Sequence, residues 1–175
     1  MDLLAWLQNL EEYPKIYWKD RLEQKAFAGA GLGDSPTTYS WRFFSSAKAL
    51  HWQDFSYPTQ FSPRIFQEAK TPSALCWEAK RPLHSIQTPN REEWRNLMQK
   101  TLLAIEQKTF EKCVLARERL LHFEKPLDPW PIVAELERNV SNAYVLCIQP
   151  TPRSAFLSAT PEKLFSRKNQ LLETE

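Results

Sequence analysis

The sequence predicts an α+β fold in which mainly antiparallel strands are flanked by helices. Apolar residues spaced by three and four from Trp94 to Ile105 predict one face of a long helix. Two short apolar runs, residues 143–149 and 154–158, are separated by a proline-containing turn and predict a hairpin. The chain has 175 residues, of which 42% are apolar and 13% aromatic, and this composition is typical of a globular protein with a sizeable core.

The charge pattern excludes several classes of partner. The formal net charge is +2, from 23 basic and 21 acidic residues that are interspersed, so no basic stripe is available for a phosphate backbone. Asp2 lies in a short amphipathic pattern at the N-terminus, where a signal peptide would have a basic and then an apolar region. No apolar run approaches the roughly 18 residues of a membrane span. We therefore expect a soluble, cytoplasmic protein with no nucleic acid or membrane partner.

Residues with thiol or imidazole side chains are few. They are Cys76, Cys113, Cys147, His51, His84 and His122. The cysteines are odd in number and have apolar neighbours, which predicts buried, reduced thiols and no disulfide framework. Neither a His-x-x-x-His nor a Cys-x-x-Cys spacing occurs, so the sequence predicts no zinc site.

The first elements are expected to be a helix and a pair of strands. Residues 2–12 predict a helix that stops before Pro14, because a proline disfavours the helical conformation of the residue before it. Strands are expected from residue 16 and from residue 26. The three glycines lie within residues 29–33, where they predict a strand end and a turn with positive φ; their spacing is not that of a dinucleotide fingerprint.

The middle of the chain is rich in aromatic residues. Residues 38–69 are expected to supply core aromatics, with a short helix at 45–50 and a strand near 63–66. A further strand is expected at 76–78. The long helix should span residues 91–108, with Thr88 or Asn90 as its cap.

Beyond the long helix, residues 113–116 form a short apolar run flanked by charges, which predicts a strand buried on both faces and continuing to Leu121. Asp128 before a proline predicts the cap of a second helix at residues 130–139. Lys112 stands at the mouth of the predicted strand, where partial desolvation would allow it to serve as a base.

A second chemical signal follows further along the chain. The segment Ala-Thr-Pro-Glu-x-Leu at residues 159–164 places Glu162 after a proline at a strand end, and Lys-x-Val-Leu-Ala-Arg at 112–117 precedes it. In this order the two segments closely resemble the chorismate-utilising enzymes, the family of anthranilate synthase component I. Within that family they resemble the isochorismate synthases of menaquinone or siderophore pathways, and residues 13–21 and 26–29 resemble the opening strand pair of the menaquinone type.

The resemblance implies that Lys112 is the general base and Glu162 the general acid that convert chorismate to isochorismate. Arg117 is expected to pair with a carboxylate, and Thr160 and Pro161 to set the backbone that aims Glu162. Salicylate synthases share the lysine and are the nearest alternative, whereas anthranilate and aminodeoxychorismate synthases usually have glutamine at this position.

The resemblance also implies that the chain is the N-terminal part of the chorismate-binding α/β sandwich. Residues 1–175 are then one incomplete domain, with a meander region at 1–87, the start of the catalytic core at 88–175, and the C-terminal half missing. The cofactor would be Mg²⁺, with its glutamate ligands expected beyond Glu175. We therefore expect the isolated chain to be inactive. The alternative from another class is a non-catalytic remnant of a truncated gene.

Overall fold

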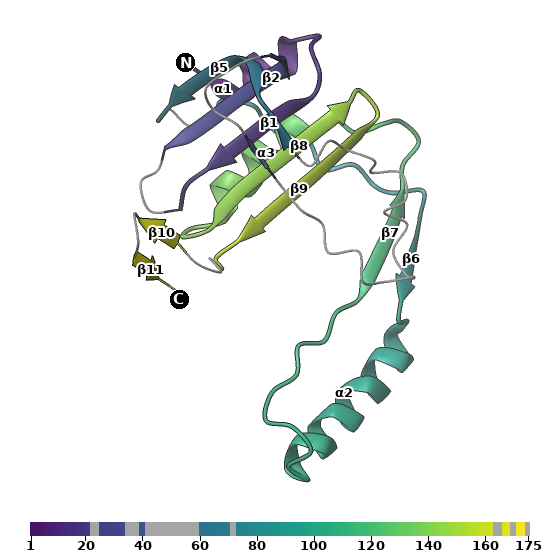
Figure 1. Ribbon diagram of the computed structural model, residues 1–175. Helices are drawn as coiled ribbons and strands as arrows, with labels where there is room; N and C mark the ends of the chain where they lie inside the picture. Colours follow the sequence, from purple (N-terminus) through teal and green to yellow (C-terminus); the bar gives the residue numbers. More distant parts are fainter. Residues whose placement is uncertain are drawn as a thin grey trace. The chain divides into compact units, whose positions relative to one another are not determined.

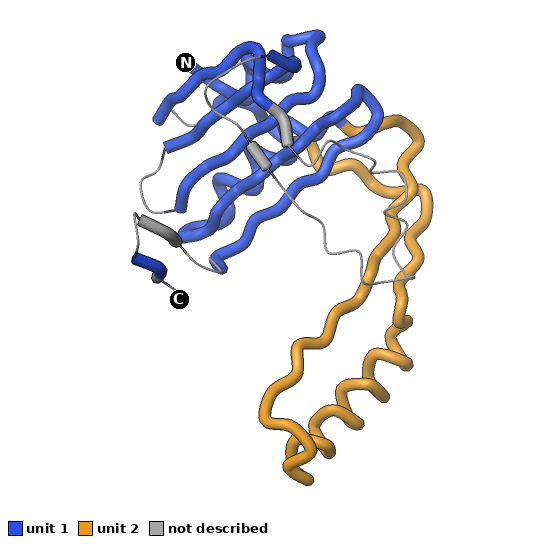
Figure 2. Tube along the Cα trace, viewed as in Figure 1, with its two compact units in different colours: residues 1–77, 128–175 blue, residues 78–127 orange. Residues whose placement is uncertain are grey.

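The structure, a computed structural model, describes residues 1–21, 25–33, 39–40, 60–70, 73–162, 166–168 and 171–173. It divides the chain into two units, which Figure 2 shows in different colours. Unit 1 comprises residues 1–77 and 128–175, and unit 2 comprises residues 78–127. The single domain with regions 1–87 and 88–175 stays a prediction.

Unit 1 is built on a five-stranded antiparallel sheet with the order β5-β2-β1-β8-β9 (Figure 1). Its strands are β1 Lys15–Lys19, β2 Ala26–Leu32, β5 Pro63–Ala69, β8 Tyr144–Thr151 and β9 Ser154–Thr160. Two separate two-stranded sheets are formed by β3 Tyr39–Ser40 with β4 Gln60–Phe61, and by β10 Ser166–Lys168 with β11 Leu171–Glu173. The antiparallel sheet confirms the predicted fold class, and β8 with β9 is the predicted hairpin.

Two helices, α1 Leu3–Asn9 and α3 Pro129–Asn139, cover one face of the sheet and contact each other. The buried residues of this layer are Leu3, Leu4, Leu7, Tyr17, Ala26, Ala28, Ala30, Trp130, Val133, Ala134, Val145 and Cys147. Small alanines at alternate positions of β2 face the leucines of α1, because alternate side chains of a strand point to the same face. Burial of these apolar side chains holds the helices on the sheet.

Both helices of unit 1 begin at an aspartate. Asp2 accepts hydrogen bonds from the backbone N–H groups of Leu4 and Ala5, each at 3.1 Å, and Asp128 accepts one from Trp130 at 3.1 Å. Such caps satisfy amide groups that have no partner inside the helix. The cap of α3 confirms the prediction, whereas α1 ends at Asn9, before the predicted boundary.

Two further expectations for unit 1 are corrected, and one is confirmed. Residues 76–78 form no strand, and Cys76 is exposed rather than buried. Gly31 has φ of +70°, so the glycine-rich segment does contain the predicted positive φ. The predicted helix at 45–50 lies outside the described residues.

Unit 2 consists of β6 His84–Thr88, α2 Arg91–Glu106 and β7 Glu118–His122. The two strands form an antiparallel pair, and the chain between them contains α2. Asn90 caps α2 as predicted, and the Glu93 side chain bonds back to the Asn90 N–H in a capping box. No residue of unit 2 is buried, which leaves the predicted apolar face of α2 without a covering layer in the described part of the chain.

Candidate active site

Lys112 lies in unit 2, between the end of α2 and the start of β7 at Glu118. Its side chain is exposed, and residues 112–117 form neither helix nor strand. The predicted buried strand at 113–116 is therefore wrong: Val114 is 82% exposed. A strand needs a neighbour to exchange backbone hydrogen bonds, and within the described residues β7 pairs with β6 only from Glu118 onward.

The segment that carries Lys112 contacts α2 through Arg117. The Arg117 guanidinium lies over the Trp94 ring, 5.7 Å from the ring centroid, which is within reach of a cation–π attraction. Arg117 forms no ion pair within the described residues, and its pairing with a carboxylate stays a prediction. The planar guanidinium contacts an aromatic face, and this contact ties the end of the segment to the helix.

Glu162 lies in unit 1, just beyond the end of β9 at Thr160, and its side chain is exposed. Its backbone N–H donates to Oγ1 of Thr160 over 3.3 Å. A guanidinium nitrogen of Arg21, which follows β1, donates to the carbonyl oxygen of Pro161. These two bonds hold the N–H and the carbonyl group of the peptide that joins Pro161 to Glu162. The role of Thr160 and Pro161 in aiming Glu162 stays a prediction.

The two candidate catalytic residues belong to different units, Lys112 to unit 2 and Glu162 to unit 1. Both side chains are exposed, so both can be reached by a small molecule in solution. Their roles as base and acid toward one substrate stay predictions.

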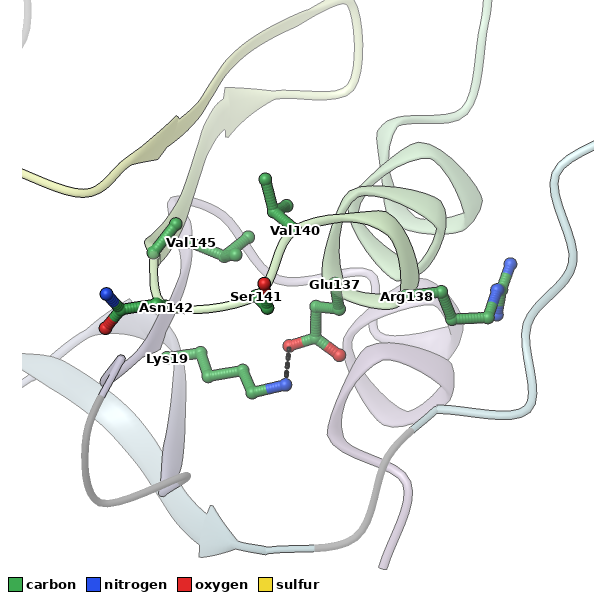
Figure 3. Close-up of a pocket in the computed structure, with 8 residues that line it drawn as sticks. Lys19, Glu137, Arg138, Val140, Ser141, Asn142 and Val145 are labelled. Atoms are coloured by element: carbon green, nitrogen blue, oxygen red, sulfur yellow. Dashed lines mark ion pairs between the residues drawn. The ribbon is translucent and has the colours of Figure 1, made fainter.

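A pocket of about 250 Å³ lies in unit 1, beside the ends of β1 and α3 (Figure 3). It is lined by Lys19, Glu137, Arg138, Val140, Ser141, Asn142, Ala143 and Val145. The Lys19 side chain reaches toward Glu137, and its Nζ lies 3.8 Å from Glu137 Oε1. The hydroxyl of Tyr17 donates a hydrogen bond to the same oxygen. Neither predicted catalytic residue lines this pocket.

The surroundings of the Glu137 carboxyl group change its pKa. Its side chain is only 6% exposed, and this burial raises its pKa, although the hydrogen bond from Tyr17 and the charge of Lys19 oppose the rise. Burial and the neighbouring Glu137 raise the pKa of Tyr17, so the phenol stays protonated and acts as a donor. The sequence analysis missed this cluster because β1 and α3 are far apart in the chain. The one local signal is that Tyr17 and Lys19 share a face of β1.

The described residues contain no group of three or more His, Cys, Asp or Glu side chains that could hold a metal ion. They do not fit Mg²⁺, which requires oxygen ligands in near-octahedral geometry. The thiols also differ from expectation: Cys147 is buried, but Cys113, like Cys76, is exposed. No helix within the described ranges is both long and apolar enough to cross a membrane.

The chain is similar over its whole length to known isochorismate synthases. It is 28% identical to Isochorismate synthase MenF of Haemophilus influenzae, in an alignment that covers 100% of this chain and 48% of that protein. It is 23% identical to Isochorismate synthase MenF of Escherichia coli, over 99% of this chain and 50% of that protein. Over a shorter region, 33% of this chain and 10% of the relative, it is 40% identical to Isochorismate synthase 2, chloroplastic, of Arabidopsis thaliana.

The fold has a solved counterpart in the menaquinone-specific isochorismate synthase MenF from Escherichia coli, which matches with a TM-score of 0.65 at 18% identity. That match covers 99% of this chain and 50% of the solved chain, so this chain spans about half the length of the relatives it matches. The family described as "Chorismate binding enzyme" matches residues 64–175, which is more than half of the chain. The chain therefore belongs to the chorismate binding enzyme family.

Proposed function

We propose that this chain forms one half of an isochorismate synthase, with Lys112 as general base and Glu162 as general acid. The observation that carries the proposal is that a chain of the chorismate binding family, similar to isochorismate synthases, carries Lys112 and Glu162 as exposed side chains in its two characteristic segments. In the proposed reaction water attacks C2 of chorismate while the 4-hydroxyl leaves. Lys112 would take a proton from the attacking water, and Glu162 would give one to the leaving oxygen.

The identity of residue 112 supports water as the nucleophile. Family members that use ammonia usually have glutamine at this position, because ammonia needs no base of this kind. Salicylate synthases share the lysine and go on to eliminate pyruvate, so they differ in product rather than in the first step. Product analysis therefore has to separate isochorismate from salicylate.

We also propose that a polypeptide equivalent to the second half of the relatives completes this protein. The chain spans about half of those relatives, and unit 2 exposes many large apolar side chains that no described residue buries. They are Leu83, Ile86, Leu97, Met98, Leu102, Leu103, Phe110, Val114, Leu120 and Leu121. Exposure of so many large apolar side chains supports a missing partner, and Phe110 and Val114 among them lie next to Lys112 in the sequence.

The same second half would supply the Mg²⁺ ligands, since the described residues contain no suitable group. We therefore expect no isochorismate synthase activity from the isolated chain. Mg²⁺ bound by the completed protein would act as a Lewis acid toward the substrate.

The test is an assay of chorismate conversion with Mg²⁺, coupled to an isochorismate-consuming enzyme. The chain is assayed alone and together with any polypeptide encoded downstream of it. The proposal predicts activity only in the mixture, and loss of that activity in Lys112→Ala and in Glu162→Gln. Lys100→Ala and Glu124→Gln replace exposed residues of the same types outside the two segments, and we expect them to retain activity.

Three results would count against the proposal. Full activity of the mixture with Lys112→Ala would show that Lys112 is not the general base. Salicylate as the only product would assign the chain to the salicylate synthases. Inactivity of every mixture, although the two polypeptides bind each other, would favour the non-catalytic remnant.

A further inference from the structure

Two histidines that are distant in the sequence lie side by side in unit 2. His84 opens β6 and His122 closes β7, and the antiparallel register places the two residues directly opposite each other. Their rings are stacked, with centroids 4.0 Å apart and an angle of 17° between the ring planes. The backbone N–H of Leu83 donates to the carbonyl oxygen of His122 over 2.7 Å, so the backbone is also paired at this end of the ladder.

The imidazole nitrogens of both residues are available for binding. Both side chains are exposed, and within the described residues neither ring takes part in a hydrogen bond or an ion pair. A structural histidine usually uses at least one ring nitrogen to bond a protein group, which also fixes its tautomer. In this pair each ring contacts the other, and both side chains are exposed to solvent.

The spacing of the rings suits a shared metal ion. A Zn²⁺–N bond is about 2.0–2.1 Å long, so two nitrogens up to about 4 Å apart can bind one ion. The ring centroids are 4.0 Å apart, so the two imidazoles are close enough for one nitrogen of each to reach a common ion. An imidazole lone pair lies in the ring plane, so binding requires both exposed side chains to rotate about their torsions out of the stacked arrangement. Imidazole nitrogen is a ligand for Zn²⁺, Ni²⁺ and Cu²⁺, whereas Mg²⁺ prefers oxygen.

We propose that His84 and His122 form a two-histidine site for a divalent transition-metal ion, with water in the remaining coordination positions. This site is separate from the Mg²⁺ requirement proposed for catalysis. The pair lies where the chain enters β6 and leaves β7, so a bound ion closes the long loop that contains α2 and Lys112. Such closure favours the paired state of the two strands, because it restricts the unfolded chain more than the folded one.

The experiment titrates ZnCl₂ into the chain in a buffer that does not bind metals, and follows binding by calorimetry. Because Cys76 and Cys113 are exposed thiols and would bind Zn²⁺ themselves, the titration uses the Cys76→Ser/Cys113→Ser variant. We expect one Zn²⁺ per chain, a higher unfolding midpoint in its presence, and at least about tenfold weaker binding in His84→Ala and in His122→Ala. His51→Ala, which replaces the third histidine, is the matched control and should bind as the parent does.

A second measurement needs no substitution of the pair. In a sample with isotopically labelled histidine, added Zn²⁺ should shift the ring signals of His84 and His122 together and with the same midpoint. Binding that survives both alanine substitutions, that is lost in His51→Ala, or that shifts only one of the two rings would overturn the proposal. Stacked rings with no measurable Zn²⁺ affinity would overturn it as well.

Discussion

Replacing Tyr17 with phenylalanine removes a single hydroxyl from the interior of unit 1. That hydroxyl donates to Glu137, whose side chain is 6% exposed, and Tyr17 itself is 3% exposed. The ring and its packing stay, so the variant isolates the hydrogen bond. A hydrogen bond to a charged group contributes about 1.5–3 kcal/mol. For a chain of this size each 1 kcal/mol shifts the unfolding midpoint by about 2–4 °C, so we expect a decrease of about 3–12 °C at neutral pH.

The pH dependence identifies the cause of this loss. The folded-state pKa of Glu137 is raised above its ordinary value of 4.5, so the native state holds this proton more tightly than the unfolded state. Stability therefore falls as the pH rises from about 4.5 through the raised pKa. The Tyr17 bond opposes the rise in pKa, so its removal makes this fall larger. We expect Tyr17→Phe to cost more at about pH 8 than at about pH 5.

The assay follows circular dichroism at both pH values during heating, which gives the unfolding midpoint, and during urea titration, which gives the free energy of unfolding. Glu137→Gln is the matched control, because it keeps an acceptor for Tyr17 but cannot ionise. In the Glu137→Gln background the cost of Tyr17→Phe should be the same at both pH values. The reasoning is refuted if Tyr17→Phe in the parent chain costs the same at both pH values, or less than about 0.5 kcal/mol.

Three other substitutions test unit 1 by the same unfolding measurement. Asp2→Ala removes the cap of α1 and should lower the free energy of unfolding by about 1–2 kcal/mol. Burial raises the pKa of Asp2, but its hydrogen bonds outweigh this effect and lower the pKa below 3.8. The loss should therefore disappear as the pH falls below 3.8 through that lowered pKa. Trp130 Nε1 donates to the buried Gln149 Oε1 over 3.0 Å. Trp130→Phe removes this donor and should lower the free energy of unfolding by about 1–3 kcal/mol, and Gln149→Leu should restore part of the loss. Gly31→Ala should lower the free energy of unfolding by about 1–2 kcal/mol, because φ is +70° and the new Cβ would lie 2.5 Å from Glu12 Oε2. For each of the three substitutions, a loss below about 0.5 kcal/mol would contradict the expectation.

Local signals in the sequence were sufficient for the elements that depend on neighbouring residues. The sequence predicts Asp128 as one helix cap and narrows the other to Thr88 or Asn90, since a cap bonds to amides only two or three residues away. The structure shows Asn90 as the second cap. The hairpin of β8 and β9 was predicted because its turn residues lie between its two strands. The two segments that contain Lys112 and Glu162 led to the family for the same reason, since each is contiguous.

Residue patterns failed where burial depends on a distant partner. The apolar run at 113–116 reads as a buried strand, but burial requires a neighbouring strand, and none pairs with it within the described residues. The cysteines at 76 and 113 have apolar neighbours in the sequence and are nevertheless exposed. An apolar segment tends to be buried, but whether it is buried depends on a packing partner from another part of the folded protein.

The sequence by itself determined the fold class, the helix caps, the hairpin and the family of this protein, because each depends on contiguous residues. Only the tertiary structure decided that β1 pairs with β8, that Tyr17 and Lys19 meet Glu137, and that His84 stacks on His122. These contacts join segments far apart in the chain. They form because one sheet register and one helix docking bury the apolar face of unit 1, and because β6 and β7 pair in unit 2.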